Sequence, residues 1–403
     1  MRAVVWHGVG DIRVEDVDEP TIQDPQDAIV QLTTSAICGT DLHLLRGTIP
    51  GMRPGTIMGH EGVGVVTEVG PGVRNFRPGD RVVISPTIGC GACSYCRAGY
   101  FSQCDNANPA GRRSGTAFLG GPEANGAFHG TQAERVRVPY ANVGLIGLPE
   151  RVSDEEGILL ADMFPTGWFG ARLAEVTPGD TVAVFGCGPV GLFTILSAWQ
   201  QGAGRVLAVD GVESRLEQAR GLHAEVINYN VEDPVAALVE LTGGIGPDRV
   251  IDAVGVDAQR PESGPAVAAE DDVHRLEKEH AATVPSARPG ETAQILSDER
   301  AQVLQWAVEA VAKAGTLAII GNYPLNARIF PIGLAMNKNL TLNAGSCHHR
   351  KYIPKLLDMI TSQQLDITSV LTQEEPITGD VLRAYEAFGQ HKPGWTKVAL
   401  TTV

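Results

Sequence analysis

Apolar residues recur with two different spacings along the chain, and the change between them falls near Leu159. Upstream of this residue, short runs alternate apolar and polar positions and are separated by turns rich in Gly and Pro, such as Pro78-Gly79-Asp80. A period of two places successive side chains on opposite faces of a strand, so each run is expected to lie in a sheet. The strands predicted in this way include Ala28–Thr33, Gly62–Val69 and Arg81–Ser85.

Downstream of Leu159, strand-like runs alternate with stretches of helical period. Such alternation is typical of a parallel sheet with helices on both faces. Strands are predicted at Thr181–Phe185, Arg205–Val209, Glu225–Tyr229, Arg249–Val254 and Thr316–Ile320. Helices are predicted at Val190–Gln201, Glu213–Leu222, Pro234–Leu241 and Glu299–Lys313. The predicted fold class is therefore α/β, with a β-rich domain followed by a doubly wound parallel sheet.

These patterns divide the chain into three segments. Residues 1–160 form the β-rich domain and residues 161–340 the parallel-sheet domain. Residues 341–403 contain a further helix near Tyr352–Gln363 and a strand at Lys397–Thr402, and they are expected to return to the first domain.

An insertion at 256–298 interrupts the second domain. Loops between strands and helices of such sheets usually need only about 2–6 residues. This one is far longer and contains Pro261, Pro265, Pro285 and Pro289. It is either a surface loop or an ordered excursion beside a cofactor.

Composition and charge exclude some function classes. Hydrophobic residues make up 43% of the 403 residues and charged residues 20%, as in ordinary globular enzymes. A formal charge of −15 argues against nucleic acid or an anionic membrane as the main partner. The N-terminus lacks a secretory signal pattern. Residues Thr181–Trp199 carry no charge, but Gly186, Gly188, Pro189 and Gly191 interrupt them, so a cytoplasmic protein is expected.

Four cysteines, Cys90, Cys93, Cys96 and Cys104, lie in one short run with the spacing of a zinc site. Two disulfides or four unrelated thiols are the alternatives. Because four thiolates fill a tetrahedral shell, zinc held here is structural, and catalysis is expected elsewhere.

A second motif, Gly186-Cys187-Gly188-Pro189-Val190-Gly191, follows a predicted strand and opens a predicted helix. In this context the glycines permit a tight turn, a close approach to a pyrophosphate, and packing of helix on strand. Asp210 ends the next strand, where its carboxylate accepts hydrogen bonds from ribose hydroxyls and repels a 2′-phosphate. NAD is therefore predicted over NADP, although Arg215 is also placed to meet a phosphate. A tight turn without a ligand is the alternative.

Three further segments carry residues that bind metals. They are Cys38-Gly39-Thr40-Asp41-Leu42-His43, Gly59-His60-Glu61 and the segment around Asp162. Singly they are unremarkable. Together with the four cysteines and the glycine-rich motif, in this order, they resemble zinc-dependent alcohol dehydrogenases of the medium-chain dehydrogenase/reductase superfamily, over essentially the whole chain.

The resemblance implies a GroES-like catalytic domain made from both chain ends, with a Rossmann NAD-binding domain between them. It also implies a catalytic zinc held by Cys38, His60 and Asp162, and thus two zinc ions per chain. Most members have cysteine at the third position. Asp162 and the long insertion instead resemble the glutathione-independent formaldehyde dehydrogenase branch, in which the insertion is implied to wrap the cofactor.

The implied reaction transfers a hydride between a small alcohol, or an aldehyde hydrate, and NAD. By family position, Thr40 takes the proton and His43 passes it to solvent, whereas a turn residue and a surface histidine are the alternatives. Glu61 lies behind the zinc ligands or exchanges with them. Thr166 packs on the nicotinamide or caps a helix in a Pro-Thr-Gly turn. A homodimer or homotetramer is expected.

Other interpretations remain open at this point. With tightly held NAD, the enzyme would dismutate aldehydes as an aldehyde dismutase or formaldehyde dehydrogenase. If the protein is a binding protein rather than an enzyme, the four-cysteine run would be a zinc ribbon that binds nucleic acid or a partner. His348 and His349 either contact cofactor or substrate or lie in a solvated loop.

Overall fold

The structure is a computed structural model that describes residues 1–109, 111, 115–256, 258–267, 302–325, 327, 330–363 and 365–402. It divides into two compact units, one formed by Met1–Pro165 with Ser346–Val403 and the other by Thr166–Gly345. The sequence patterns put these boundaries after residues 160 and 340. Of the predicted insertion, residue 257 and residues 268–298 lie outside the described residues.

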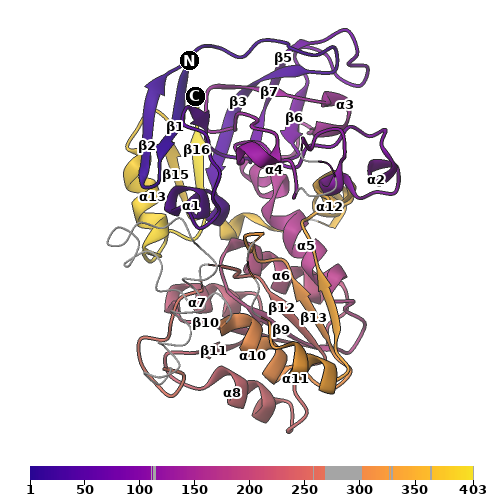
Figure 1. Cartoon of the computed structure of the whole chain (residues 1–403), viewed down its shortest axis with the longest axis vertical. Coiled ribbons are helices and arrows are strands. Elements are labelled where there is room, and N and C mark those ends of the chain that lie inside the picture. Colours follow the sequence, from indigo (N-terminus) through magenta and orange to yellow (C-terminus); the bar gives the residue numbers. More distant parts are fainter. Residues whose placement is uncertain are drawn as a thin grey trace. The chain divides into compact units, whose positions relative to one another are not determined.

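The first unit is built mainly from antiparallel strands (Figure 1). Its strands are β1 (Arg2–Gly8), β2 (Asp11–Asp16), β3 (Ala28–Ile37), β4 (Thr56–Ile57), β5 (Gly62–Val69), β6 (Arg81–Ile84), β7 (Arg135–Val138), β8 (Leu145–Gly147), β15 (Gln373–Pro376) and β16 (Val398–Thr401). One sheet has the order β15-β16-β3-β5-β6-β8, with β7 paired to β3, and a smaller sheet has the order β2-β1-β4.

Strand β3 is the structural centre of this unit, because it pairs with β5, β7 and β16. Its antiparallel register with β16 joins Val398 to Ile37, so the C-terminal end of the chain completes the sheet begun near the N-terminus. Apolar side chains of β3 fill cores on its two faces: Val30 and Leu32 in one, Ile37 in the other. Residues Ser346–Val403 thus belong to the same compact unit as Met1–Pro165.

Helices of the first unit follow the local cues of the sequence. They are α1 (Gly39–Arg46), α2 (Ser94–Arg97), α3 (Ala141–Gly144), α4 (Asp154–Ala161), α12 (His349–Gln363) and α13 (Val381–Gly389), and α5 (Met163–Leu173) crosses the boundary between the units. Ser153 and Glu156 begin α4 with a reciprocal capping box at 3.1 and 2.9 Å. This cap fixes the start of the helix that ends at Asp162.

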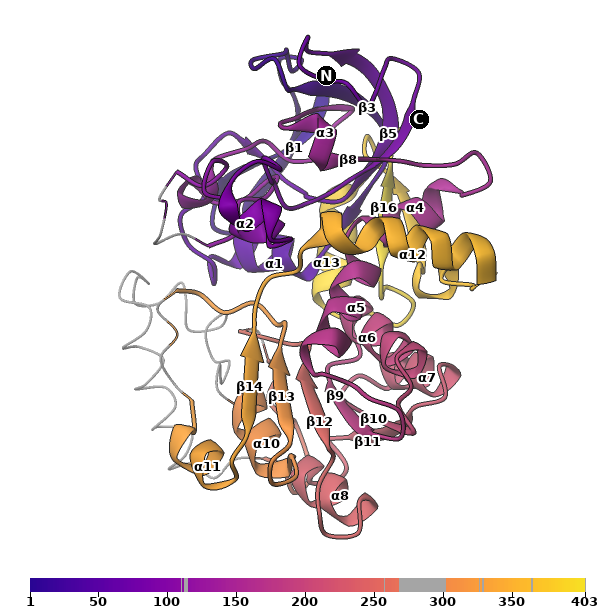
Figure 2. The same cartoon turned by 90° about the vertical axis from the view of Figure 1, so that its right-hand side faces the viewer.

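The second unit contains a parallel sheet of order β11-β10-β9-β12-β13-β14, whose strands are labelled in Figure 2. Its strands are β9 (Thr181–Phe185), β10 (Arg205–Asp210), β11 (Glu225–Asn228), β12 (Arg249–Asp252), β13 (Thr316–Ile319) and β14 (Thr341–Ala344). The helices between them are α6 (Pro189–Gln200), α7 (Glu213–Gly221), α8 (Pro234–Leu241), α10 (Gln302–Ala310) and α11 (Ile332–Asn337). The predicted α/β class with a doubly wound sheet is confirmed.

The strand order reverses beside β9, since the chain first builds outward through β10 and β11 and then returns to add β12 on the other side of β9. In open α/β sheets, ligands bind at the carboxyl ends of the strands at such a point. The turn that begins at Gly186 lies there, and Gly186 approaches Val254, which follows β12.

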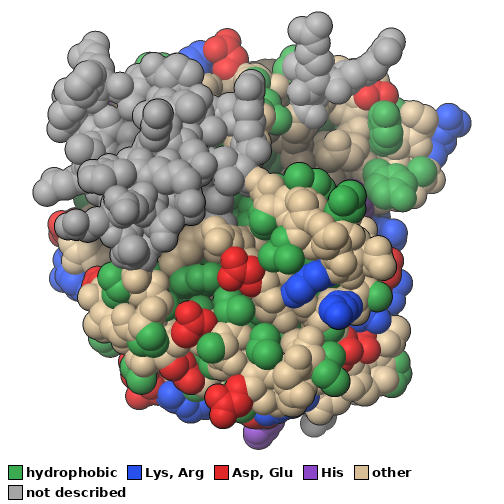
Figure 3. Space-filling model, turned by 60° about the horizontal axis from the view of Figure 1, so that its bottom comes forward, with side chains coloured by type: hydrophobic (Ala, Val, Ile, Leu, Met, Phe, Trp, Pro, Cys, Tyr) green, Lys and Arg blue, Asp and Glu red, His purple; other side chains and the backbone are tan. Residues whose placement is uncertain are grey.

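Two observations concern the outside of the protein. Among the described residues, no helix has both the length and the apolar character required to cross a bilayer. On the face drawn in Figure 3, acidic and basic side chains lie interspersed among apolar and polar ones.

A matched pair of glycines tests the packing of the first unit. A Cβ on Gly64 of β5 would overlap the backbone oxygen of Gln31 on β3, whereas a Cβ on Gly147 of β8 would meet nothing within 4 Å. We expect Gly64→Ala to destabilise the protein by about 1–3 kcal/mol, because the strands cannot separate without breaking their pairing. Gly147→Ala should leave the melting temperature nearly unchanged. Thermal unfolding of both variants measures this, and equal melting temperatures would contradict the close packing of β3 and β5.

Candidate functional site

Four buried side chains from separate elements meet in the first unit. Cys38 lies between β3 and α1, His60 and Glu61 lie between β4 and β5, and Asp162 ends α4. Gly59 has φ +88°, and a Cβ there would strike the Gln132 side chain, so only glycine fits before His60. One sheet and one helix end therefore bring together residues up to 124 positions apart.

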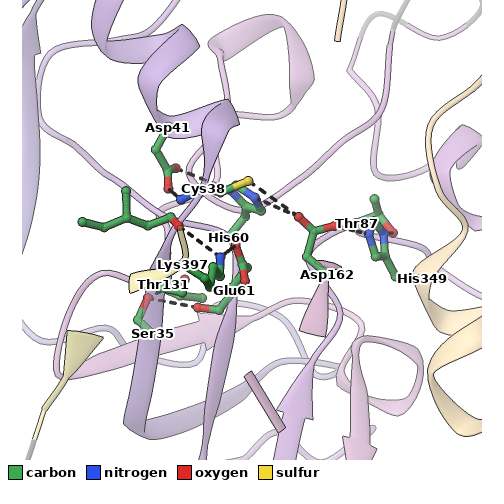
Figure 4. Close-up of polar contacts among 12 residues, drawn as sticks. Ser35, Cys38, Asp41, His60, Glu61, Thr87, Thr131, Asp162, His349 and Lys397 are labelled. Atoms are coloured by element: carbon green, nitrogen blue, oxygen red, sulfur yellow. Dashed lines mark hydrogen bonds and ion pairs between the residues drawn. The ribbon is translucent and has the colours of Figure 1, made fainter. Parts of the chain in front are cut away.

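The donor atoms of Cys38, His60, Glu61 and Asp162 all lie within 4.8 Å of one another (Figure 4). Asp162 Oδ2 is 3.4 Å from His60 Nε2 and 3.9 Å from Cys38 Sγ. Ligands at the usual zinc distances in a tetrahedron are separated by about 3.3–3.6 Å. The mixed thiol, imidazole and carboxylate set therefore fits a Zn²⁺ ion, and it brings together the residues that the sequence proposed as ligands.

Burial controls the charges in this cluster. Burial raises the pKa of the Cys38 thiol, while the imidazole of His60 opposes that rise. Burial also acts to raise the pKa of Asp162, but hydrogen bonds from His349 and His60 outweigh it and hold this pKa well below its usual range. The buried, ionised carboxylate of Asp162 favours a nearby cation, and a metal ion would also favour the thiolate of Cys38, which agrees with a metal site.

Asp41, which the sequence analysis did not single out as a site residue, fixes both Cys38 and His60. Its Oδ2 accepts hydrogen bonds from the Cys38 backbone N–H at 2.9 Å and from Gln132 Nε2 at 3.2 Å. Its Oδ1 faces His60 Nδ1 at 3.5 Å. Burial acts to lower the pKa of His60, but Asp41 and Cys38 outweigh it and raise this pKa well above its ordinary value. Because Nδ1 faces the carboxylate, Nε2 is left for the cluster.

Glu61 forms a buried ion pair that sequence reasoning missed. Its Oε1 lies 2.6 Å from Lys397 Nζ, and neither side chain has any exposed surface. Lys397 Nζ also donates to Ile37 O at 3.0 Å. Burial raises the pKa of Glu61 to about 7, although Lys397 acts in the other direction. Lys397 immediately precedes the apolar strand β16. A charged residue in that position was the sequence signal that could have indicated a buried ion pair.

The proposed relay residues lie on α1, which begins directly after Cys38. Thr40 is half-buried and His43 is buried, and they stand one helical turn apart. Their roles stay predictions.

His348 and His349, whose role the sequence left open, are both buried. His349 Nε2 lies 2.6 Å from Asp162 Oδ1, and its Nδ1 lies 3.3 Å from Thr87 Oγ1. His348 Nδ1 lies 2.7 Å from Ser102 Oγ, close to the four-cysteine run. The solvated-loop alternative is wrong, because both side chains are buried, and α12 begins at His349 rather than near Tyr352.

Cys90, Cys93, Cys96 and Cys104 form the other candidate metal cluster. Cys93 Sγ lies 4.0 Å from Cys104 Sγ, close to the separation of about 3.8 Å expected between two sulfurs on one zinc ion. None of the cysteines, all of which the structure describes, forms a disulfide, so the disulfide alternative is wrong.

Backbone N–H groups surround these sulfurs. The N–H of Cys90 donates to Cys104 Sγ at 3.2 Å, and the N–H groups of Ala92 and Cys93 donate to Cys90 Sγ at 3.3 Å. Burial acts to raise the pKa of Cys93, but hydrogen bonds from the backbone of Cys96 and Asp105 outweigh it and lower this pKa to about 7. Burial instead raises the pKa of the Cys96 and Cys104 thiols, so the backbone donors favour the thiolate, the form that binds zinc, most clearly at Cys93.

In the second unit, the glycine-rich turn has the geometry of a phosphate-binding turn. Gly186 has φ +90°, and a Cβ on Gly191 would overlap the Gly186 carbonyl. Gly188 precedes α6, and Pro189 and Val190 form its first turn. A Cβ on Gly188 would lie 3.9 Å from Arg215 Nη1, so the guanidinium stands beside the turn.

Asp210 connects this turn to the end of β10. Its Oδ2 accepts from the Cys187 N–H at 2.7 Å and its Oδ1 accepts from the Val212 N–H at 2.8 Å. The carboxylate is thus rigidly placed, and each oxygen retains a further acceptor position.

Thr166 lies inside α5, so the expected Pro-Thr-Gly turn and the helix-cap alternative are wrong. Gly167 instead lets α5 pack against Phe193 of α6.

Comparisons with known proteins agree with this arrangement. Residues 24–150 match the family described as Alcohol dehydrogenase GroES-like domain, and residues 189–269 match the family described as Zinc-binding dehydrogenase.

Relatives match over nearly the full chain. An uncharacterized zinc-type alcohol dehydrogenase-like protein, AdhB of Bacillus subtilis, is 35% identical over 99% of this chain and 100% of its own. The glutathione-independent formaldehyde dehydrogenase of Pseudomonas aeruginosa is 32% identical over 97% of this chain and 96% of its own. Among solved structures, alcohol dehydrogenase TADH from Thermus sp. ATN1 superimposes with a TM-score of 0.80 at 33% identity, covering 100% of this chain and 99% of that one.

The two clusters predict separable metal losses. Cys93→Ser should lower the zinc content from about two ions per chain to about one and lower the melting temperature, because a structural site contributes directly to folding. Cys347→Ser changes a buried cysteine outside both clusters and should keep both ions. Elemental analysis with thermal unfolding measures this. Full zinc content in Cys93→Ser would refute the four-sulfur site.

Proposed function

This chain belongs to the zinc-type alcohol dehydrogenases of the medium-chain superfamily, and we propose that Cys38, His60 and Asp162 hold its catalytic zinc. The protein is a zinc-dependent oxidoreductase that transfers hydride between an alcohol and NAD. The convergence of these three buried ligands with Glu61 carries the proposal.

When bound, zinc supplies a Lewis acid for the oxygen of an alcohol or aldehyde hydrate, and NAD supplies the hydride acceptor. Cys38, His60 and Asp162 would hold this ion and would leave a position for the substrate oxygen. Asp41 orients His60, and Lys397 holds Glu61 in the buried ion pair behind the ligands. The protein thereby keeps a charged, dry cluster in one geometry.

A proton must leave this buried cluster during alcohol oxidation. We assign its removal to Thr40 and then His43, which lie one turn apart on α1 directly after Cys38. A hydroxyl both accepts and donates, and an imidazole exchanges protons near neutral pH, so this order of groups suits a relay.

The four-cysteine run serves as the structural zinc site in this proposal. It falls inside the matched GroES-like domain, at residues 24–150, which favours that role over a nucleic-acid-binding zinc ribbon. Backbone donors to Cys90 and Cys104 support the thiolate form.

For the cofactor, we assign the pyrophosphate to the turn from Gly186 to Gly191 at the start of α6. Asp210 is assigned to the adenosine ribose and Arg215 to the adjacent phosphate or ribose. Thr166 is assigned to the nicotinamide side. The rigid hold on Asp210 by two backbone N–H groups supports its role in choosing NAD.

Aldehyde dismutation with tightly held NAD is the second candidate, and the start of the insertion favours it. Glu262 N–H donates to Asn230 Oδ1 at 2.7 Å, and Ser263 Oγ donates to Asn230 O at 2.9 Å. Asn230 Nδ2 in turn donates to Gly211 O at 3.1 Å, next to Asp210. The described start of the insertion is therefore held beside Gly211, next to Asp210, which is assigned to the adenosine ribose.

A homodimer or homotetramer is proposed for the assembly. The parallel sheet ends at β14, whose Leu342 is 39% exposed, and the preceding α11 exposes Ile332 and Met336. An apolar sheet edge of this kind favours pairing with a second copy. No disulfide joins the described cysteines, which agrees with the proposed cytoplasmic location.

A panel of alcohols and aldehydes, followed at the NADH absorbance with and without added NAD, tests the function. We expect NAD-dependent oxidation that Asp162→Ala abolishes together with about one zinc ion per chain. Turnover of an aldehyde to equal amounts of acid and alcohol without added NAD would select dismutation. Activity and full zinc content in Asp162→Ala would refute the assigned site.

His43→Ala tests the relay. Alcohol oxidation should slow by roughly 10- to 100-fold while zinc content is retained, because the path for the proton is broken. Added imidazole should restore part of the rate by replacing the missing group. An unchanged rate with intact zinc would remove His43 from the mechanism.

Asp210 tests the cofactor assignment. Asp210→Asn retains a side-chain acceptor for the turn but removes the negative charge, so the ratio of kcat/KM for NAD over NADP should fall by about 10-fold or more. Steady-state rates with both cofactors measure this ratio. Wild-type protein that uses both equally would overturn the role of Asp210.

A further inference from the structure

A chain of hydrogen bonds leads away from Asp162 on the side opposite Cys38 and His60 (Figure 4). Asp162 Oδ2 faces the two proposed ligands, whereas Oδ1 lies 2.6 Å from His349 Nε2. His349 Nδ1 continues to Thr87 Oγ1 at 3.3 Å. Each oxygen of the carboxylate therefore has a different neighbour.

The direction of these hydrogen bonds follows from the chemistry of the groups. A carboxylate only accepts, so His349 Nε2 carries the proton and donates it to Asp162 Oδ1. In the neutral imidazole, Nδ1 is then an acceptor, and the Thr87 hydroxyl donates to it. Asp162 thus selects the tautomer in which His349 donates from Nε2, and the Thr87 hydroxyl adapts to it and holds the other ring nitrogen.

A carboxylate needs such a partner more than a thiolate does. A cysteine ligand has a single donor atom, whose position follows from the side-chain rotamer. An aspartate has two equivalent oxygens and rotates freely about χ2, so it binds a metal through either oxygen or both unless one is held. His349 and Asp162 are buried, and water does not readily replace the hydrogen bond between them.

We propose that His349 is a positioning residue that commits Asp162 to bind the catalytic zinc through Oδ2 alone. The proposal rests on the ligand role of Asp162 proposed above. It makes the aspartate at this position and the histidine at the start of α12 a functional pair, and it gives Thr87 the task of orienting the histidine.

Zinc affinity and a cobalt spectrum test this without relying on activity. In the holoenzyme, zinc of the catalytic site would be titrated against a chromophoric chelator, and Co²⁺ would then replace it. His349→Ala should weaken zinc binding by about 10- to 100-fold, the usual effect of removing a partner of a metal ligand, and should change the Co²⁺ visible bands. His349→Gln, which keeps an N–H donor, should recover part of both.

The adjacent histidine is the matched control. His348 adjoins His349 in the chain, but its Nδ1 lies beside Ser102 Oγ. His348→Gln should therefore change the affinity of the catalytic site by less than about twofold. An equal loss in His348→Gln would show that disturbing the start of α12, not losing the hydrogen bond, is responsible, and it would overturn the proposal.

A cysteine background isolates the pairing. With Asp162→Cys the single sulfur needs no second partner, so adding His349→Ala should no longer weaken zinc binding beyond about twofold. The proposal fails if His349→Ala alone leaves affinity and spectrum unchanged. It also fails if this variant loses the metal as completely as Asp162→Ala, since His349 would then be a ligand. Retention of catalytic-site zinc by Asp162→Ala would instead refute the site assignment itself.

Discussion

The burial of negative charge around His60 is the constraint on which the first unit depends. The ligand atoms of Cys38, Glu61 and Asp162 lie within 4.8 Å of one another and of His60, Asp41 faces His60 Nδ1 at 3.5 Å, and water reaches almost none of these groups. Uncompensated, such burial would cost several kcal/mol per charge. Each group is offset differently: Lys397 pairs with Glu61, backbone and amide N–H groups hold Asp41, and His349 holds one side of Asp162. The negative charge that these partners do not offset faces the space between Cys38, His60 and Asp162. A divalent cation in that space would neutralise it.

This charge balance also explains why both ends of the chain are needed. Lys397 reaches Glu61 only because β16 pairs with β3, and the same lysine donates to Ile37 O at the end of β3, next to Cys38. His349 reaches Asp162 from the start of α12. The C-terminal segment is therefore part of the site rather than an appendage of the sheet, because it supplies positive and donor groups that the N-terminal segment lacks.

The predictability of the two metal clusters differs for a physical reason. The four cysteines lie within fifteen residues, so their spacing alone specifies a loop that closes on one ion, and the structure keeps them together. The cluster at Cys38 has no local signature, and only its motifs in order pointed to it.

Strands such as Gly62–Val69 and Thr181–Phe185 were predicted with their observed bounds, since strand periodicity is also local. The partnership of His349 with Asp162 spans 187 positions and left no trace in either neighbourhood. Thr166 was placed in a turn because Pro and Gly flank it, but close packing of Gly167 on α6 favoured helix instead.

Aspartate at position 162 changes what the surrounding protein must do. A thiolate would bring charge and a single donor, whereas the carboxylate brings the same charge with two donors and a harder oxygen. Its second oxygen would be a buried, unsatisfied acceptor if the position were otherwise unchanged. The structure resolves this with a histidine that donates to the spare oxygen and a threonine that holds the histidine's other ring nitrogen. The identity of the third ligand and the identity of residue 349 are thus linked through one hydrogen bond. A substitution at either position alters the geometry offered to the metal, even though only one of the two residues faces it.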